Sequence, residues 1–205
     1  MGLQIENLNT IPLLKQRRVH GKALALIGVV LAVLCSQWGT AWADGASANR
    51  EYQVKAAFIT KFLPFIEWPA DSSKKSDAPL VIGVVNDPSG RDPFDDALDK
   101  FATGKSCNGR SIAVRHVQPD ADVTECDVLF IPASQDGNLK ALLKAAEGRP
   151  ILTVGESDAF PWAGGSVRFY LEDNKVRFEV SLDALKASRI SASSKFLALG
   201  KQFKK

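Results

Sequence analysis

Histidine and cysteine are scarce in this 205-residue sequence, which contains two histidines and three cysteines. Beyond residue 43 the remaining ones are His116, Cys107 and Cys126. A metal site built from several histidines is therefore excluded in that region, and a four-cysteine zinc site lacks its thiols. We expect neither a metal nor another cofactor.

Signature motifs of several enzyme classes are also missing. No G-x-S-x-G segment accompanies His116, and no G-x-G-x-x-G follows the first predicted strand. Gly104-Lys105-Ser106 resembles the end of a phosphate-binding loop, but Asp99 stands where that pattern requires its first glycine. A loop and a strand follow this segment, so no helix N-terminus is predicted there to bind phosphate. We expect no catalytic site.

The charge distribution excludes another class of partner. The formal net charge of the whole sequence is +3. Residues 1–43 carry this excess, because they hold four basic residues against Glu6, and the remainder of the chain is neutral. Nucleic-acid binding depends on clustered Lys and Arg side chains that neutralise phosphates. We therefore expect no nucleic acid among the partners.

The first 43 residues show the pattern of a secretory leader. A basic segment from Lys15 to Lys22 precedes the apolar run from Ala23 to Cys35, and Ala41-Trp42-Ala43 is an A-x-A cleavage site. The apolar run is shorter than the ~20 residues that a transmembrane helix needs, although an uncleaved anchor is the alternative. We interpret the chain as three parts: a signal peptide at 1–43, a flexible N-terminus at 44–50 and a domain at 51–205.

Export has a consequence for the two remaining cysteines. Oxidising compartments favour disulfides, and exported proteins seldom keep thiols reduced. A bond between Cys107 and Cys126 would close a loop worth ~3 kcal/mol of chain entropy. We expect this disulfide; two separate buried thiols are the alternative.

The first part of the domain is predicted to be a helix. Val54, Phe58, Phe62 and Phe65 recur at helical spacing along one stripe. Pro64 is expected to kink this helix or to convert its last turn.

The rest of the domain alternates between predicted strands and helices. Continuous or alternating apolar segments predict strands at 80–85, 112–116, 128–131 and 151–154, with helices at 93–101 and 139–146 and a β-hairpin formed by 167–171 and 176–180. Short helices at 182–186 and 193–203 are expected to close the chain. This order predicts an α/β fold: a single mixed sheet flanked by helices on both faces, followed by the hairpin and the short helices.

Large aromatic residues stand at the ends of predicted elements. They occur in Glu67-Trp68-Pro69, after the first helix, and in Phe160-Pro161-Trp162, after the fourth strand. Exposed aromatic side chains can anchor a partner, so we expect these two segments to form a partner-binding surface. A lid over the core is the alternative interpretation. Gly164-Gly165 indicates a tight turn or a close approach of the backbone.

An ordered set of segments supports a more specific hypothesis. The set consists of the first helix from Glu51 to Pro69, Leu80–Val84, Asp87-Pro88 with Phe94, Gly109–Val114, Cys126–Ile131, Ile151–Gly155, Phe160 with Gly164-Gly165, Val176–Val180 and Lys195–Leu199. In this order the segments resemble the YfiR/HmsC family of periplasmic regulators over about residues 51–200. Two positions depart from the family pattern, Pro64 in the first helix and Ser181 where the family commonly has Asn.

The resemblance implies regulation rather than catalysis. Members of this family repress an inner-membrane diguanylate cyclase by contacting its periplasmic sensor, and an outer-membrane lipoprotein can sequester the repressor. The family implies an α/β fold, disulfides and a homodimer. We accordingly expect a periplasmic repressor that controls cyclic-di-GMP signalling and biofilm formation through protein–protein contact. The alternative is a periplasmic small-molecule sensor, with its ligand at the carboxyl ends of the strands near Asn86 to Gly90.

Cleavage of the leader is the first testable prediction. The A-x-A pattern places the new N-terminus at Asp44, because signal peptidase cuts after the second small residue of that site. Mass spectrometry of the protein recovered from the periplasm should show a chain that begins at Asp44. A chain that keeps Met1, or a lipid on Cys35, would contradict the prediction.

Overall fold

The computed structural model describes residues 39–70, 78–87, 90 and 93–204. Gly45 to the end of the chain forms one compact unit. The expected signal peptide lies largely outside the described residues. Within the described part, no helix is both long and apolar enough to cross a membrane.

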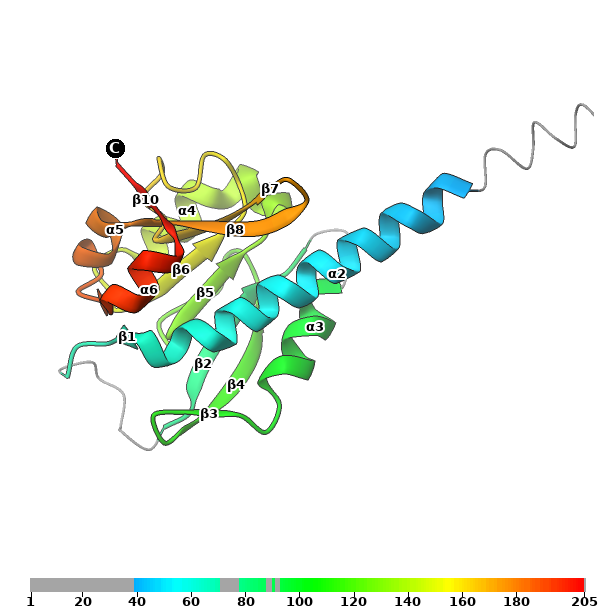
Figure 1. Cartoon of the computed structure of the whole chain (residues 1–205). Helices are drawn as coiled ribbons and strands as arrows, with labels where there is room; N and C mark the ends of the chain where they lie inside the picture. Colours follow the sequence, from blue (N-terminus) through cyan, green and yellow to red (C-terminus); the bar gives the residue numbers. More distant parts are fainter. Residues whose placement is uncertain (1–38, 71–77, 88–89, 91–92, 205) are drawn as a thin grey trace, which may run out of the picture. The chain divides into compact units, whose positions relative to one another are not determined.

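Helices and strands alternate along the unit (Figure 1). The helical segments are α2 (Gly39–Phe62), η1 (Leu63–Phe65), α3 (Pro93–Ala102), η2 (Ala133–Asn138), α4 (Leu139–Ala146), α5 (Leu182–Ala187) and α6 (Ser194–Leu199). The strands are β1 (Ile66–Glu67), β2 (Leu80–Val85), β3 (Ser106–Cys107), β4 (Arg110–Val117), β5 (Val128–Ile131), β6 (Leu152–Gly155), β7 (Val167–Glu172), β8 (Lys175–Ser181), β9 (Ser191–Ala192) and β10 (Lys201–Phe203).

Eight of these strands form one mixed sheet in the order β10-β8-β7-β6-β5-β2-β4-β3. The five central neighbours from β7 to β4 are parallel, and the β7–β8 hairpin and β3 add antiparallel pairs. Strand β10 runs parallel to β8 at one edge. The small strands β1 and β9 pair separately. The prediction of a mixed sheet flanked by helices is therefore confirmed.

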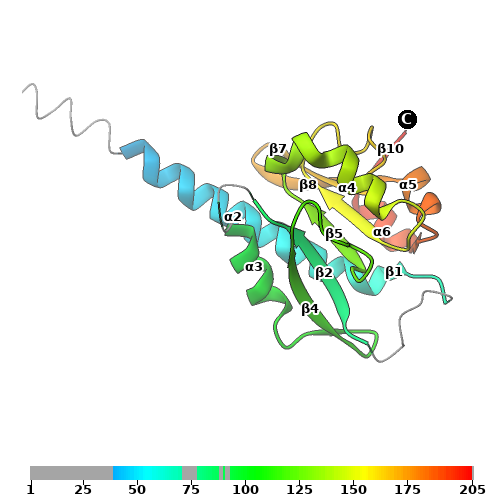
Figure 2. The ribbon, with the colours of Figure 1, turned by 180° about the vertical axis from the view of Figure 1, so that it is seen from behind.

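The sheet separates two layers of core. Along β2, Leu80, Ile82 and Val84 point to the cluster that contains side chains of α2 and α3, whereas Val81 and Val85 point to the cluster that contains α4. This alternation follows from the period of two in a strand, and it explains why β2 is apolar at every position. Figures 1 and 2 show α2 and α4 on opposite faces.

Helix α2 packs through most of the expected stripe: Phe62 is buried, and Phe58 and Phe65 pack against the core. Its fully buried apolar residues are Ala56, Ile59 and Phe62, whereas Val54 is 39% exposed. Phe62 lies in a cluster of aromatic rings that joins the helix to the hairpin and to α6, with contacts to Phe58, Phe169, Phe178 and Phe196. Pro64 lies in η1, so the predicted conversion of the last helical turn is confirmed.

A buried ion pair holds the polar part of the packed face of α2. The side chain of Lys55 is 6% exposed, and its Nζ lies 2.6 Å from Oε1 of Glu156, which follows β6. Glu51 supplies a second carboxylate one turn away, and the Tyr52 ring lies 5.0 Å from Nζ. The other carboxylate oxygen of Glu156 accepts from the Ala133 N–H at 3.2 Å. Because a buried charge needs such partners, Lys55 sets which face of α2 meets the sheet.

Asp127 connects the amino-terminal ends of the central strands, at the opposite end of the strands from Glu156. Its buried carboxylate accepts from the Val81 N–H at 2.8 Å and from the Arg110 guanidinium at 3.1 Å. Its carbonyl accepts from the Leu152 N–H at 2.9 Å and from Trp68 Nε1 at 3.3 Å. One residue thereby contacts the beginnings of β2, β4 and β6 and the segment after α2.

The two ends of the domain show further features. Residues 44–50 lie within α2, where Gln53 donates to Asn49 four residues earlier at 3.1 Å, and the flexibility expected of them stays a prediction. The closing helix expected at 193–203 ends at Leu199 and is followed by β10. Gly200 marks the change, because a Cβ there would lie 2.3 Å from the Phe178 ring.

Replacement of Asp127 tests its role at these strand ends. Asp127→Ala leaves the buried Val81 N–H without its acceptor and removes the carboxylate partner of Arg110, which keeps the Ala78 and Pro79 carbonyls. We therefore expect the free energy of unfolding to fall by about 3 kcal/mol. Asp127→Asn, which keeps an oxygen acceptor, should lose about half as much. Urea denaturation followed by circular dichroism measures both variants. The exposed Asp120→Ala should change stability by less than about 0.5 kcal/mol, and an equal loss there would refute the assignment.

Candidate partner-binding surface

Of the first expected anchor segment, Trp68 is integrated into the fold. Its ring is half-buried and packs against the core beneath α2, and its Nε1 donates to the Asp127 carbonyl. Glu67 is exposed in β1, where it pairs with Ser191 of β9, and Pro69 is half-buried. Trp68 therefore ties the end of the first helical region to the amino end of β5.

The second expected segment divides into a buried and an exposed part. Phe160 is fully buried, and Pro161 is buried beside it. The Phe160 ring lies between two glycines: a Cβ at Gly155 would come within 2.2 Å of it, and a Cβ at Gly165 within 2.0 Å. Gly164 has φ +102°, so the glycine pair serves both a turn and a close approach.

Trp162 is the exposed member of this segment, with 58% of its surface accessible. Its ring meets that of Phe203 in β10 edge-on, with the ring centroids 4.9 Å apart. This contact joins the loop after β6 to the edge strand of the sheet. Trp162 is thus an exposed ring held in place by the half-buried Phe203, which suits it to anchor a partner.

The two expected segments lie at opposite ends of the parallel strands. Trp68 contacts the amino end of β5, whereas the loop that carries Trp162 follows the carboxyl end of the parallel strand β6. In Figure 1 this loop, in yellow, lies above the sheet and β1 lies at its lower left. The segments do not build one continuous surface.

Charged residues that sequence reasoning did not single out surround Trp162. Arg168 Nε donates to Glu179 Oε1 at 2.6 Å, and the same guanidinium also pairs with the exposed Asp158. Arg168 and Glu179 are direct cross-strand partners in the hairpin. Counting the hairpin register back from the turn at 173–174 places these two residues opposite each other. The sequence could therefore have predicted this ion pair.

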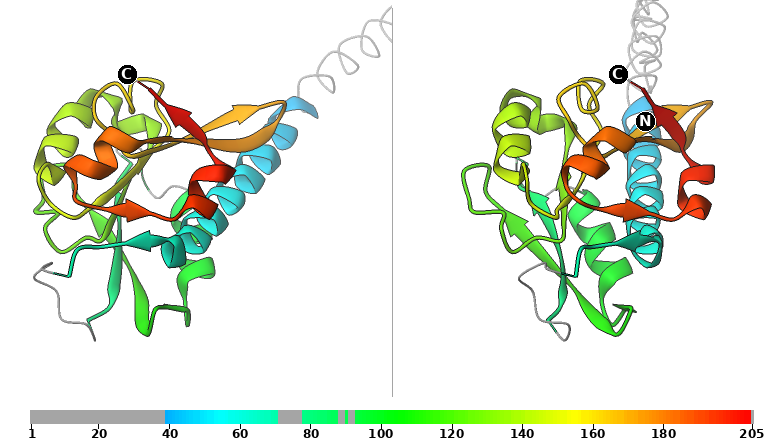
Figure 3. Two further views of the ribbon diagram at one scale, coloured as in Figure 1. Left: turned by 60° about the vertical axis from the view of Figure 1, so that its left-hand side comes forward. Right: turned by 90° about the vertical axis from the view of Figure 1, so that its left-hand side faces the viewer.

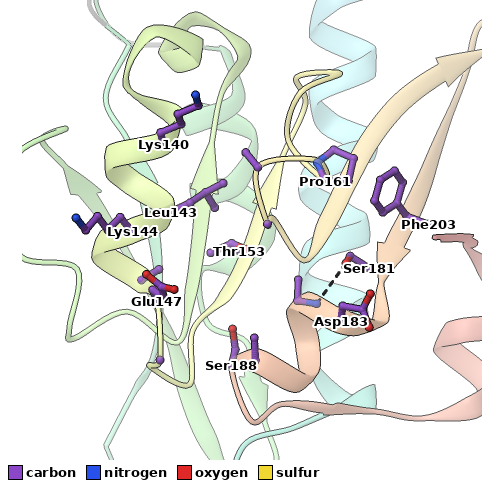
Figure 4. A pocket seen from close by; sticks show the side chains of 16 residues that line it. Lys140, Leu143, Lys144, Glu147, Thr153, Pro161, Ser181, Asp183, Ser188 and Phe203 are labelled. Atoms are coloured by element: carbon purple, nitrogen blue, oxygen red, sulfur yellow. Dashed lines mark hydrogen bonds between the residues drawn. The ribbon is translucent and has the colours of Figure 1, made fainter. Parts of the chain in front are cut away.

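A hollow of about 430 Å³ lies between α4 and α5 (Figure 4). Lys140 and Lys144 of α4 stand on one side, and Asp183 of α5 stands on the other. The hydroxyls of Thr153 and Ser181 lie between them; Ser181 caps α5 by accepting from the Ala184 N–H at 3.3 Å. Glu147 places a carboxylate on the α4 side as well, and Figure 4 shows Lys144 extending away from α5, so charges of both signs line the hollow. The ligand position expected near Asn86 to Gly90 includes residues 88 and 89, which lie outside the described residues.

The expected disulfide is not formed in the structure. Cys107 is buried in the core cluster beneath α2 and α3, and Cys126 is buried in the cluster beneath α4. The Cys126 sulfur packs over Gly83, where a Cβ would lie 2.5 Å from it. The two thiols lie in different core clusters, and β2 and β4 lie between β3, which holds Cys107, and β5, which follows Cys126. This arrangement does not bring them to the short Cα separation that a disulfide requires. Burial raises the pKa of Cys107, and the Arg110 charge opposes this effect.

No metal site emerges from the part of the chain that the structure describes, where no group of three or more His, Cys, Asp or Glu side chains is placed to hold an ion. His116 is partly exposed near the end of β4, with its Nδ1 3.7 Å from a carboxylate oxygen of Asp95.

Comparison with known proteins assigns this chain to a family. A family model described as YfiR/HmsC-like matches residues 52–201. The chain belongs to this family. The matched region begins in α2 and ends in β10, so it includes both edges of the sheet. YfiR/HmsC-like proteins are a family of periplasmic regulators.

Two solved structures share the fold at low sequence identity. A conserved domain protein from Vibrio cholerae O1 biovar El Tor is 11% identical, with a TM-score of 0.52 over 75% of this chain. The ABC domain in complex with L-Trp from Streptococcus pneumonia is 8% identical, with a TM-score of 0.50 over 74% of this chain. The chain spans 60% of the length of each. These likenesses show the fold alone.

Substitution of the two tryptophans separates their roles. Trp68→Ala removes a half-buried ring and its hydrogen bond, so it should lower the free energy of unfolding by about 2 kcal/mol. Trp162→Ala removes a mostly exposed ring and should change it by less than about 0.5 kcal/mol. Urea denaturation of both variants provides the measurement. Equal stability of the two variants would show that Trp68 is not part of the core.

Proposed function

We propose that this protein is a periplasmic repressor of an inner-membrane diguanylate cyclase, which it restrains by binding the periplasmic sensor of that enzyme. The observation that carries the proposal is membership of the YfiR/HmsC-like family across residues 52–201. Regulation of cyclic-di-GMP signalling is the theme of this family. An outer-membrane lipoprotein that sequesters the repressor, and a homodimeric state, complete the proposal.

The energetics of such a repressor are modest. A binding protein shifts an equilibrium between two sensor states only by the difference between its affinities for them. A hundredfold preference for the inactive state corresponds to about 2.7 kcal/mol. That difference is enough to silence a cyclase whose active state is otherwise moderately populated.

A second function is supported by the hollow between α4 and α5. Lys140 can receive a carboxylate, and the carboxylates of Glu147 and Asp183, which also line the hollow, can receive an ammonium group. This arrangement suits a small zwitterion, and the structurally similar ABC domain was determined in complex with L-Trp. A small-molecule sensor is compatible with repression, because a ligand that fills the hollow can change the affinity for the sensor.

Gene deletion tests the repressor function. Loss of this gene should raise cyclic-di-GMP and biofilm formation, because the cyclase sensor is released. The same deletion in a strain that lacks the cyclase should have no effect. Mass spectrometry of extracted cyclic-di-GMP measures both. An unchanged level in the single deletion, or an equal rise without the cyclase, would rule the function out.

A further inference from the structure

The edge of the sheet at β10 combines three features of a docking site. It carries the outermost strand of the sheet, the exposed Trp162 in contact with the half-buried Phe203, and a neighbouring groove. The groove encloses about 550 Å³ and is lined by Asp158, Trp162, Arg168, Glu179, Lys201, Gln202, Phe203 and Lys204. Figure 3 shows β10, in red, at the side of the hairpin.

The backbone of β10 offers an open row of hydrogen-bonding groups. Lys201, Gln202 and Phe203 pair with Glu179, Val180 and Ser181 of β8 on one side. In the described part of the chain no strand pairs with the other side. An open edge of this kind accepts an extended segment as an additional strand, and neighbouring side-chain pockets supply the specificity.

The charge at this edge selects the chemistry of the added segment. Arg168 pairs with both acidic residues of the groove, Asp158 and Glu179. One guanidinium balances only one of these two carboxylates, so with Lys201 and Lys204 the charged residues of the groove have a net charge of +1. The surrounding sequence has the same sign, since residues 182–205 hold six basic residues and one acidic residue, a net charge of +5.

Lysines on an edge strand commonly protect a protein against aggregation. They prevent identical edges from pairing with one another and so oppose aggregation. That repulsion is selective, because it excludes a second basic edge and attracts an acidic one. Protection alone leaves unexplained why a ring as large as Trp162 stays 58% exposed beside the same edge.

We propose that the β10 edge, with the Trp162–Phe203 pair as its anchor, is the docking site for an extended acidic segment of the partner. The segment adds to the sheet beside β10, places its carboxylates near Lys201 and Lys204, and packs one apolar side chain against Trp162. This proposal rests on the proposed function for the identity of the partner, the cyclase sensor.

A direct binding experiment tests the site without reference to the partner. The probe is a blocked eight-residue peptide of alternating glutamate and valine, and its control is the lysine–valine counterpart. NMR titration of the protein from Asp44 onward should show the acidic peptide shifting the amide signals of residues 201–204. The lysine peptide should bind about tenfold more weakly. Shifts that avoid β10, or equal binding of both peptides, would overturn the proposal.

Variants extend the test to the cell. The double substitution Lys201→Glu with Lys204→Glu should weaken acidic-peptide binding about tenfold, and Trp162→Ala should weaken it to a similar degree. Both should fail to restore repression in the deletion strain. The matched control is Lys100→Glu with Lys105→Glu, which reverses two exposed charges near the opposite edge of the sheet and should behave as wild type.

The outcomes separate this proposal from the proposed function. If deletion of the gene leaves cyclic-di-GMP unchanged, the repressor function fails and the peptide titration still decides the site. If deletion raises cyclic-di-GMP but the variants at Trp162, Lys201 and Lys204 repress fully, the docking site is wrong. Increased self-association of the Lys201→Glu, Lys204→Glu protein with unchanged peptide binding would assign the lysines to protection alone.

Discussion

The hydrogen bonds of Asp127 hold together the amino-terminal ends of the central strands, and the arrangement of the sheet depends on them. A single buried carboxylate accepts from β2 and from Arg110 at the start of β4, while the carbonyl of the same residue accepts from β6 and Trp68. Parallel strands need long connections, so their starting points are far apart in sequence. Asp127 supplies a common reference for those points, and the register of the central strands follows from it.

At the carboxyl-terminal ends of the strands, the packing of α2 depends on a second buried charge, that of Lys55. Lys55 and Glu156 approach to 2.6 Å, and this pair holds α2 against the sheet. The two ends of the strands are therefore aligned by polar contacts, whereas the layers between them are filled by apolar side chains. Buried polar contacts of this kind favour one arrangement over others of similar packing, which suits a protein whose surface must present a defined shape to a partner.

The central strands and the hairpin could be predicted from the sequence because they have strong local patterns, whereas the short edge strands β3 and β10 were not predicted. Leu80–Val85 is apolar throughout since both its faces are buried, and the hairpin alternates around a clear turn. Contacts between distant residues were not accessible in this way. Nothing local indicates that Phe160 lies between Gly155 and Gly165, that Lys55 is buried, or that Cys107 and Cys126 lie in different core clusters. The aromatic residues were correctly noticed, but their exposure depends on the tertiary fold.

The aromatic cluster around Phe62 has a consequence for how the chain reaches this structure. Phe62 of α2 contacts Phe178 of β8 and Phe196 of α6, which lie near the other end of the sequence. A chain that emerges N-terminus first, from a ribosome or from a translocation channel, presents α2 long before these rings exist. The apolar side of α2 therefore stays exposed to solvent until β8 and α6 have been synthesised and have folded onto it. Long-range contacts of this kind slow folding and leave intermediates prone to aggregation, so the interval before closure is the time at which a chaperone would be of most use.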